Sequence, residues 1–483
     1  MIIDVLSLFF LIIVFILFWL IKCEWRRVFL LLSCFAYVGY IDKKALIFVL
    51  VTSALFYFGG KIIEKKSDAP RKSGENDSDK AKSIYYFLII MAAISLIVFK
   101  YGHTIATMGI VPESLSYSLV VPIGYSFYIL GSISYISDIY LGKRKAETSL
   151  FNYILYMCWF PKFVSGPIED EKRISGELNK INEYRLTLDN CKLAFYRILY
   201  GIFVKLVVAD RIGLYVNDLY NNKESFGSVS LLFGTILYSM QIYFDFCGYT
   251  TLARGVSTLF GVELSENFKT PYCAENISEF WRRWHMSLST WLKNYIYIPL
   301  GGNKKGEARK VLNLIIVFLV SGFWHGATLA FIVWGLLHGI YSVINAYFQK
   351  KNISFFTKGM SGRIITFIEV SFAWIFFRAG SIKEAINYIK CMCTNGIQME
   401  YLKSHFNQGL RQAIDPALAI GFMMFLIILD VISYRKNKEI PELICEFSRG
   451  KRILVLYGLV IVIFVFGNYG ASILEKTLIY MQF

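Results

Sequence analysis

Charged residues are scarce in this sequence. Only 18% of the 483 residues are Asp, Glu, Lys or Arg, whereas 56% are hydrophobic and 17% aromatic, and the mean hydropathy is +0.49. A single water-soluble domain cannot bury an apolar fraction of this size. The composition therefore excludes an ordinary soluble globular protein and predicts an integral membrane protein.

Patterns for metal binding and for disulfides are also missing. The nine cysteines are scattered without a CxxC pair or a histidine at zinc-finger spacing, and the one close cluster, Cys391 and Cys393, has no partner histidines. We therefore predict no metal site, no disulfide framework and no bound cofactor. No repeat of solenoid or propeller length is visible, and the apolar segments are too unequal for inverted transporter halves. One integral domain over residues 1–483 is the simplest division.

Apolar runs dominate what the sequence does contain. Uncharged runs close to the length that crosses a bilayer as a helix occur at 5–21, 83–99, 114–137, 226–244 and 453–474. Eight shorter or interrupted runs accompany them, and several of these should be tilted, re-entrant or buried helices. The pattern predicts an all-α polytopic protein with about eleven transmembrane helices. Residues 1–23 should stay as the first helix, because no small-residue cleavage site follows them.

Basic residues outnumber acidic ones. The sequence has 51 Lys and Arg against 35 Asp and Glu, a net charge of +16, which in a soluble protein would suggest nucleic acid. Here the basic residues cluster between apolar runs, as in cytoplasmic loops under the positive-inside rule. We therefore expect contacts with membrane lipids, anionic lipids among them, and no nucleic-acid partner.

One carboxylate follows directly on a long uncharged run. Asp245 lies in the stretch QIYFDFCGY of residues 241–249. A charge near the bilayer centre costs about 2.5–3.5 kcal/mol on insertion scales, so this side chain should either pair or reach the interface. It could be a structural carboxylate that ties Tyr or Arg side chains between helices, or it could take part in catalysis.

Aromatic and cationic residues alternate in residues 280–295. One face of a continuous helix would carry Trp281, Trp284, Leu288 and Trp291. This spacing predicts an interfacial or re-entrant amphipathic helix. Arg282 and Arg283 could then meet phosphates, either of lipid headgroups or of a nucleotide-bearing donor. His285 lies in the same segment, either as an active-site group or as a histidine hydrogen-bonded for structure.

A histidine with small neighbours ends another apolar run. His325 follows fourteen uncharged residues, is preceded by Trp324 and is flanked by Gly322 and Gly326. An ionisable group at membrane depth is a functional candidate, and a neutral imidazole can take a proton from a hydroxyl near neutral pH. His338 lies about 220° further around one continuous helix, so we expect it to have a structural role.

Five stretches of this sequence resemble one protein family. They are VPIGYSFYILGSISYISDIY (121–140), FPKFVSGPI (160–168), QIYFDFCGYTTLARG (241–255), ENFKTPYCAENISEFWRRWHMSLSTWLKNYIYIPLGGN (266–303) and FWHGATLAFIVWGLLHG (323–339). The chain resembles the membrane-bound O-acyltransferase superfamily, within it the bacterial alginate and peptidoglycan O-acetyltransferases, which are related to the teichoic-acid D-alanylation membrane protein. The resemblance implies a ring of transmembrane helices around a thin core with a central channel, formed by N-terminal helices (1–110), a catalytic core (119–345) and C-terminal helices (346–483).

The resemblance also implies roles for particular residues. The catalytic histidine of the family falls on His325, and its second recurrent histidine falls on His285. The residues expected along the substrate path or channel are Tyr243, Asp245, Trp281, Arg282, Arg283 and Trp324. Among them Tyr243 and Asp245 would line or brace the channel, and the two arginines would hold the donor at the cytoplasmic side.

The family branch sets the expected substrates. The GGN at 301–303 looks closer to the acetylating branch, which implies acetyl-CoA as the cytosolic donor and an extracytoplasmic or cell-wall polysaccharide as the acceptor. The same branch implies a multi-pass protein of the plasma membrane and a separate extracytoplasmic partner, an SGNH-type acetyltransferase. D-alanyl transfer to teichoic acid is the alternative within the family. A transporter or flippase of lipid-linked glycans and a scaffolding subunit are alternatives outside it.

Overall fold

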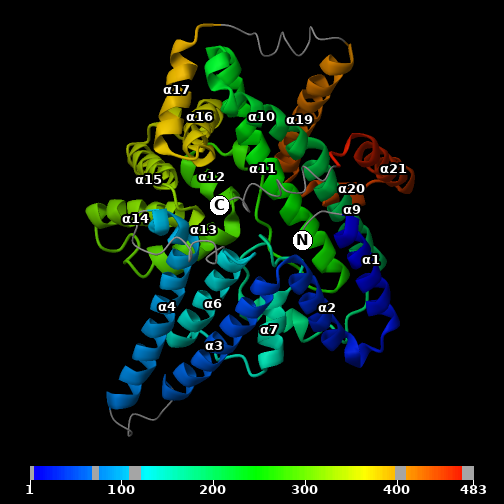
Figure 1. Ribbon diagram of the computed structural model, residues 1–483, viewed down its shortest axis with the longest axis vertical. Coiled ribbons are helices and arrows are strands. Elements are labelled where there is room, and N and C mark those ends of the chain that lie inside the picture. Colours follow the sequence, from blue (N-terminus) through cyan, green and yellow to red (C-terminus); the bar gives the residue numbers. More distant parts are fainter. Residues whose placement is uncertain (1–4, 68–74, 108–120, 398–409, 470–483) are drawn as a thin grey trace. The chain divides into compact units, whose positions relative to one another are not determined.

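The computed structural model describes residues 5–67, 75–107, 121–397 and 410–469 (Figure 1). Helices make up most of this part of the chain, and it contains no strand. Long apolar runs form helices in a bilayer because only a helix satisfies its own backbone hydrogen bonds there. The predicted all-α fold is confirmed.

Seven helices in the described ranges are long and apolar enough to cross a membrane. They are α3 (Lys43–Ser67), α4 (Glu75–Thr107), α11 (Ser228–Leu259), α14 (Glu307–His325), α15 (Leu329–Lys350), α16 (Gly359–Arg378) and α19 (Leu410–Lys436). The protein is therefore polytopic, as predicted.

The expected number of about eleven spans exceeds seven because several apolar runs form shorter helices. These are α1 (Val5–Leu20), α2 (Arg26–Ile41), α6 (Tyr125–Tyr140), α7 (Leu150–Cys158) and α9 (Leu188–Ile202). A sixth helix, α21 (Arg449–Phe466), has three basic residues in its first turn. Residues 114–120 and 470–474 of two predicted runs lie outside the described residues. The remaining α-helices are α8 (Glu171–Leu178), α10 (Asp210–Asn221), α12 (Ile277–Arg283), α13 (Met286–Leu292), α17 (Ile382–Thr394) and α20 (Ile440–Cys445).

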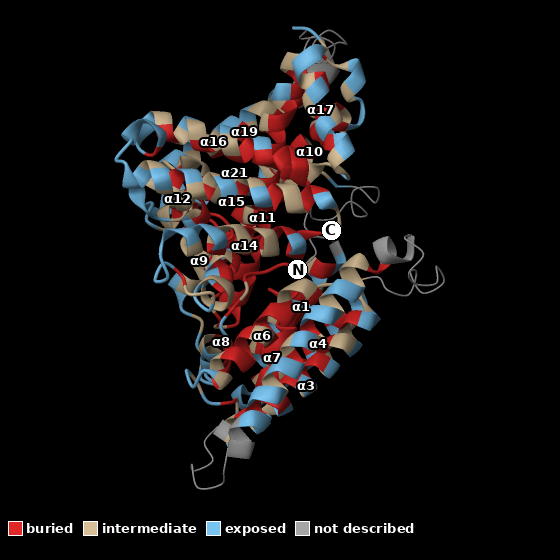
Figure 2. Cartoon of the chain, turned by 90° about the vertical axis from the view of Figure 1, so that its left-hand side faces the viewer, coloured by how far each residue is buried: buried red, intermediate tan, exposed pale blue. Residues whose placement is uncertain are grey.

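Several helices carry large apolar side chains on their exposed faces. The pale-blue faces of α3 and α4 in Figure 2 include Ile47, Val51 and Leu55 on α3 and Phe87 and Ile90 on α4. These residues repeat every three or four positions, so they form one stripe along each helix. Such a stripe is unfavourable in water and favourable against lipid chains. The faces therefore mark the surfaces of α3 and α4 that contact the bilayer.

The chain divides into two compact units. Unit 1 comprises Met1–Ala194 and Ala253–Ser265, and unit 2 comprises Phe195–Leu252 and Glu266–Phe483. The boundary at Leu252 and Ala253 lies within α11, so this helix contributes to both units. The single domain over 1–483 stays a prediction.

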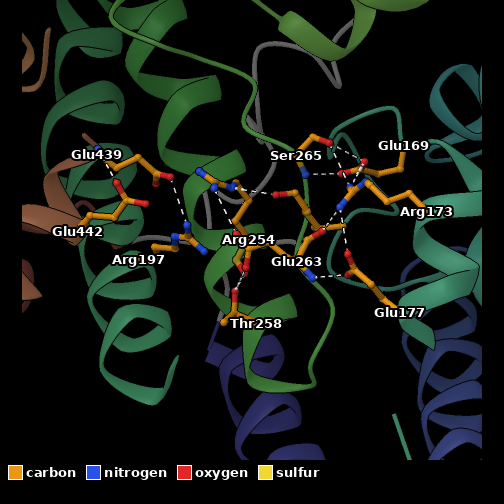
Figure 3. Close-up of polar contacts among 11 residues, drawn as sticks. Glu169, Arg173, Glu177, Arg197, Arg254, Thr258, Glu263, Ser265, Glu439 and Glu442 are labelled. Atoms are coloured by element: carbon orange, nitrogen blue, oxygen red, sulfur yellow. Dashed lines mark hydrogen bonds and ion pairs between the residues drawn. The ribbon is translucent and has the colours of Figure 1, made fainter. Parts of the chain in front are cut away.

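Unit 1 is built around α3, which packs against α4, α6 and α7 (Figure 1). Arg173 of α8 makes several polar contacts in this unit. Its guanidinium forms ion pairs with Glu169 and Glu177 (Figure 3). It also donates to the backbone oxygen of Glu263 at 2.6 Å and to Ser265 Oγ at 3.1 Å. One arginine thus fixes the segment 263–265 against α8 and the loop before it.

Unit 2 holds the two histidines that resemble the family pattern. Helix α14 packs along α15, which also contacts α12 and α16. The close packing of α14 and α15 depends on glycine, because a Cβ on Gly335 would lie 2.3 Å from the backbone oxygen of Phe318. A Cβ on Gly322 would lie 2.3 Å from the backbone oxygen of Phe331 in the same way. Small residues that bring backbones together are a common device where membrane helices meet.

Candidate active site

His325 is the last residue of α14. Gly326 follows it in an extended conformation with φ −169°, the chain turns, and α15 starts at Leu329. The His325 side chain is 4% exposed, so the helix end points it into the interior of unit 2. Any side chain at Gly326 would meet the ring of Phe331, with a Cβ only 2.2 Å from that ring. The turn after His325 therefore needs glycine.

Aromatic rings enclose His325. Its ring centroid lies 4.9 Å from that of Trp324, 5.0 Å from Trp334 and 5.3 Å from Phe377. These rings come from α14, α15 and α16, so three helices define where the imidazole sits. Enclosure of this kind excludes bulk water and strengthens electrostatic effects on a reacting group.

His285 lies at a break between two short helices. Residues 280–295 do not form the continuous amphipathic helix that the tryptophan spacing predicted, because α12 ends at Arg283 and α13 begins at Met286. Asn267 holds the break, since its backbone oxygen accepts from Met286 N at 3.0 Å and its Oδ1 accepts from Ser287 N at 3.1 Å. The helix prediction is therefore wrong at this point, although all four residues of the predicted face are buried: Trp281, Trp284, Leu288 and Trp291.

The backbone of His285 is in the left-handed region, with φ 41° and ψ 54°. This conformation is unfavourable for a residue with a Cβ, and such residues often occur at functional sites. The side chain is 1% exposed, and burial lowers the pKa of His285 to about 3. The imidazole is therefore neutral near pH 7 and able to accept or donate a hydrogen bond.

One indole connects the two candidate histidines. The ring of Trp324 lies 6.3 Å from that of His285 and 4.9 Å from that of His325. Phe246 of α11 contacts His285 from another direction, with ring centroids 4.8 Å apart. The structure thus gathers His285, Trp324 and His325 in one aromatic cluster of unit 2.

A third histidine borders this cluster. The Trp281 Nε1–H group donates to His338 Nδ1 at 3.3 Å, so a neutral His338 carries its proton on Nε2. This buried Nε2 has no hydrogen-bond partner among the described residues. The Trp334 ring lies 5.0 Å from His325 and 4.9 Å from His338, because the chain turns between α14 and α15. The predicted angle between His325 and His338 assumed one continuous helix. It does not apply, because the two histidines lie on two helices, α14 and α15.

Asp245 is paired, which was one of the two expected outcomes for a carboxylate at this depth. It forms an ion pair with the buried Lys205, which also pairs with Asp210. Its ion-pair partner is thus a lysine, whereas the structural alternative had named Tyr or Arg side chains. Lys205 belongs to a π-helical stretch, Phe203–Ala209, that joins α9 to α10. The role of Asp245 in catalysis stays a prediction.

Tyr243 lies two residues before Asp245 and contacts other groups. Its ring centroid is 6.1 Å from that of Trp284, the residue before His285, and 5.5 Å from that of Tyr272. The carboxylate of Asp430 on α19 lies near enough to interact with the Tyr243 hydroxyl. Tyr243 therefore packs against the aromatic residue that precedes His285 and also lies near a half-buried acidic side chain.

The two arginines expected at the donor site differ in exposure and in their contacts. Arg282 is exposed. Arg283 donates to Glu279 Oε1 at 2.8 Å and to the backbone oxygen of Lys269 at 3.1 Å, and it lies over the ring of Tyr434 at 4.9 Å. These protein groups already surround the Arg283 guanidinium. The exposed Arg282 is therefore the more accessible of the two arginines for a phosphate.

Two charged residues at this site went unnoticed in the sequence. Lys205 and Asp430 each stand alone in an apolar stretch, as Asp245 does. The same argument about the cost of an isolated charge in a membrane would have singled them out. Within the described residues, no group of three or more His, Cys, Asp or Glu side chains could hold a metal ion.

Comparisons with known proteins show the family of the chain. Residues 141–385, just over half of the chain, match the model of MBOAT, the membrane-bound O-acyltransferase family. Over 365 residues the chain is 34% identical to a peptidoglycan O-acetyltransferase of Helicobacter pylori, a match that covers 69% of each protein.

Two further relatives carry related names. A probable alginate O-acetylase of Pseudomonas syringae is 32% identical over 337 residues, 69% of this chain and 62% of that protein. A teichoic acid D-alanyltransferase of Bacillus subtilis is 28% identical over 251 residues, 50% of this chain and 63% of that protein. In both cases the matched part is a little under two thirds of the relative's own length. This chain is a multi-pass membrane acyltransferase that belongs to the membrane-bound O-acyltransferase family.

Proposed function

We propose that this protein takes an acetyl group from cytosolic acetyl-CoA and passes it across the membrane for O-acetylation of an extracytoplasmic or cell-wall polysaccharide. The observation that carries the proposal is the cluster of His285, Trp324 and His325, buried in unit 2 of a chain from this family. The names of the peptidoglycan and alginate relatives support acetyl as the group transferred and a polysaccharide as its destination.

His325 is the general base in this proposal. Its imidazole takes the proton of an acceptor hydroxyl while the hydroxyl oxygen attacks the thioester carbonyl. The carbon–sulfur bond then breaks, and the leaving thiolate of the donor takes up the proton that His325 had accepted. Proton transfer by a positioned histidine typically contributes about 10²–10⁴-fold to the rate. The surrounding Trp324, Trp334 and Phe377 rings hold the imidazole in one orientation, which supports such a role.

His285 is the second active-site residue in the proposal. Since it is neutral near pH 7, it can donate a hydrogen bond to the acyl oxygen without bringing a buried charge. Tyr243, Trp281 and Trp324 shape the substrate path, and the exposed Arg282 attracts the phosphates of the donor at the cytoplasmic side.

A separate extracytoplasmic SGNH-type acetyltransferase completes the proposed pathway by moving the acetyl group onto the polysaccharide. D-alanyl transfer is the competing donor chemistry, and the D-alanyltransferase match, at 28% identity over half of this chain, favours it less than the acetylase matches favour acetyl transfer.

The test uses inside-out membrane vesicles that contain the full chain and its native membrane partners. Radiolabelled acetyl-CoA is supplied outside the vesicles, and label is counted in the lumenal polysaccharide. Wild-type protein should transfer label, and His325→Ala should not, at equal amounts of folded protein. A parallel reaction supplies D-alanine charged on a carrier protein. Transfer of D-alanine and not of acetyl would replace the proposed donor, and equal transfer by His325→Ala would remove this residue from the mechanism.

A further inference from the structure

A small cavity in unit 1 has no part in the acyl transfer described above. It lies between α6, α7 and the FPKFVSGPI segment that follows α7, and its volume is about 10 Å³. That volume holds one particle of the size of a water molecule or a small ion. An acyl donor, a sugar or a phosphate does not fit.

The cavity contains a buried cation. Lys162 is 8% exposed and its ammonium lies 4.1 Å from the ring centre of Tyr156. Within the described ranges no carboxylate comes within 4.0 Å of this ammonium. Burial lowers the pKa of Lys162 to about 8, so the side chain remains mostly charged at neutral pH. A buried charge without a counter-ion is costly, which calls for something else to compensate it.

The carboxylate of Glu169 also lines the cavity, but it already interacts with other groups of the protein. The Glu169 oxygens accept from Ser265 N at 2.6 Å and from Ser265 Oγ at 2.8 Å, and they pair with Arg173 (Figure 3). Glu169 raises the pKa of Lys162 through space, without forming an ion pair with it. The lysine therefore keeps an unbalanced positive charge at the cavity wall.

A second polar group also points to a ligand. Tyr128 lines the cavity, is 5% exposed, and its hydroxyl has no hydrogen-bond partner in the described part of the chain. Its ring stacks on Phe163 with centroids 5.8 Å apart, which fixes the direction of the hydroxyl. Tyr128 and Lys162 line the same cavity, so a phenol O–H and an ammonium provide two kinds of donor for one small acceptor there.

We propose that this cavity binds a single small monovalent anion, a halide such as chloride, between the Lys162 ammonium and the Tyr128 hydroxyl. A water molecule would fit the volume, but it would bring no negative charge to balance that of Lys162. The anion balances that charge and accepts the hydrogen bond of Tyr128. The site stabilises the packing of α6 against α7 and the segment 160–168, because both donors belong to these elements.

Thermal unfolding of the purified full chain in detergent tests the proposal. The midpoint temperature is measured in sodium chloride, sodium bromide and sodium gluconate at equal ionic strength, because gluconate is too large for the cavity. A ligand that binds only the folded state raises the midpoint as its concentration rises. Wild-type protein should show this rise with chloride and bromide. Lys162→Met should lose it, whereas Lys172→Met, at an exposed lysine of α8, should keep it.

Tyr128→Phe keeps the lysine and removes one donor, so it should weaken halide binding by about tenfold, the effect of one hydrogen bond to a charged partner. If Lys162→Met does not fold, binding of radioactive chloride to wild-type protein and to Tyr128→Phe carries the test. No chloride binding by wild-type protein, or a halide response that persists in Lys162→Met, would overturn the proposal and leave water as the occupant.

Discussion

The ion-pair group of Lys205, Asp210 and Asp245 allows a prediction about the role of Asp245. Lys205→Met leaves the buried Asp245 and the half-buried Asp210 without their cation. Removing one partner of a buried ion pair typically costs about 3–5 kcal/mol. If the free-energy barrier to unfolding falls by this whole amount, the unfolding rate increases by roughly 10²–10⁴-fold. Asp245→Asn should cost far less, because Lys205 keeps its pair with Asp210.

The assay is the half-life of monodisperse protein at a fixed temperature, read by size-exclusion chromatography, since membrane proteins commonly unfold irreversibly. The triple variant Lys205→Met/Asp210→Asn/Asp245→Asn removes all three charges and should recover most of the loss, because a buried apolar or neutral replacement is often well tolerated. A triple variant no more stable than Lys205→Met alone would refute the ion-pair reasoning. Whether Asp245 also takes part in catalysis is decided by the rate of acyl transfer per folded molecule. A lower rate in Asp245→Asn would assign Asp245 to catalysis.

Three other predictions concern the histidines and the helix contact. Because burial lowers the pKa of His285 from 6.5 to about 3, the unfolded state binds a proton that the folded state does not between these pH values. The free energy of unfolding should therefore decrease as the pH is lowered from 6.5 to about 3, by up to about 1.4 kcal/mol per pH unit, and more steeply than in His285→Gln. Parallel plots of unfolding free energy against pH for the two proteins would contradict this. Gly335→Ala should destabilise the protein by about 1–3 kcal/mol through a clash with α14, whereas Gly421→Ala, which meets no neighbour, should be neutral or slightly stabilising; equal midpoint temperatures for both variants would argue against the close contact. Trp281→Phe removes the hydrogen bond to His338 and should cost about 1 kcal/mol in thermal unfolding, and a larger loss of activity than of stability would show a direct role in transfer.

The fold class was accessible from the sequence because bilayer physics leaves few options. Runs such as 83–99 and 226–244 could only be helices: residues 83–99 lie within α4, and residues 228–244 of the second run lie within α11. Helix length was harder to predict. The run 5–21 forms the 16-residue α1, and hydropathy does not distinguish a short or tilted helix from a full span.

The candidate site could be predicted in part. The residue types around His325 singled it out as an ionisable group between glycines. Its neighbours Trp334 and Phe377 depend on the packing of α14, α15 and α16, which local spacing does not reveal. The break at His285 was not predictable either, because the tryptophan spacing of residues 280–295 fits a continuous helix and the Asn267 hydrogen bonds that hold the break come from a distant segment.

The partners of charged residues depend on tertiary structure as well. Asp245 was expected either to pair or to reach the interface. It pairs, and its partner Lys205 lies forty positions away on another helical segment. Arg282 and Arg283 are adjacent in sequence, and both were expected to hold the donor. A helix turns by about 100° per residue, so neighbours point in different directions, and one arginine is exposed while the other pairs with Glu279.

The central claim is that His325 carries the acyl transfer. The most direct measurement is the rate of acetyl transfer from radiolabelled acetyl-CoA by wild-type protein, His325→Ala and His338→Ala, with thermal unfolding of each recorded alongside. His338 is the matched control, since it is an equally buried histidine on the neighbouring helix. The account predicts a loss of about 10²–10⁴-fold for His325→Ala with little change in unfolding, and for His338→Ala a loss of activity no larger than its loss of folded protein. Wild-type rates in His325→Ala would contradict it.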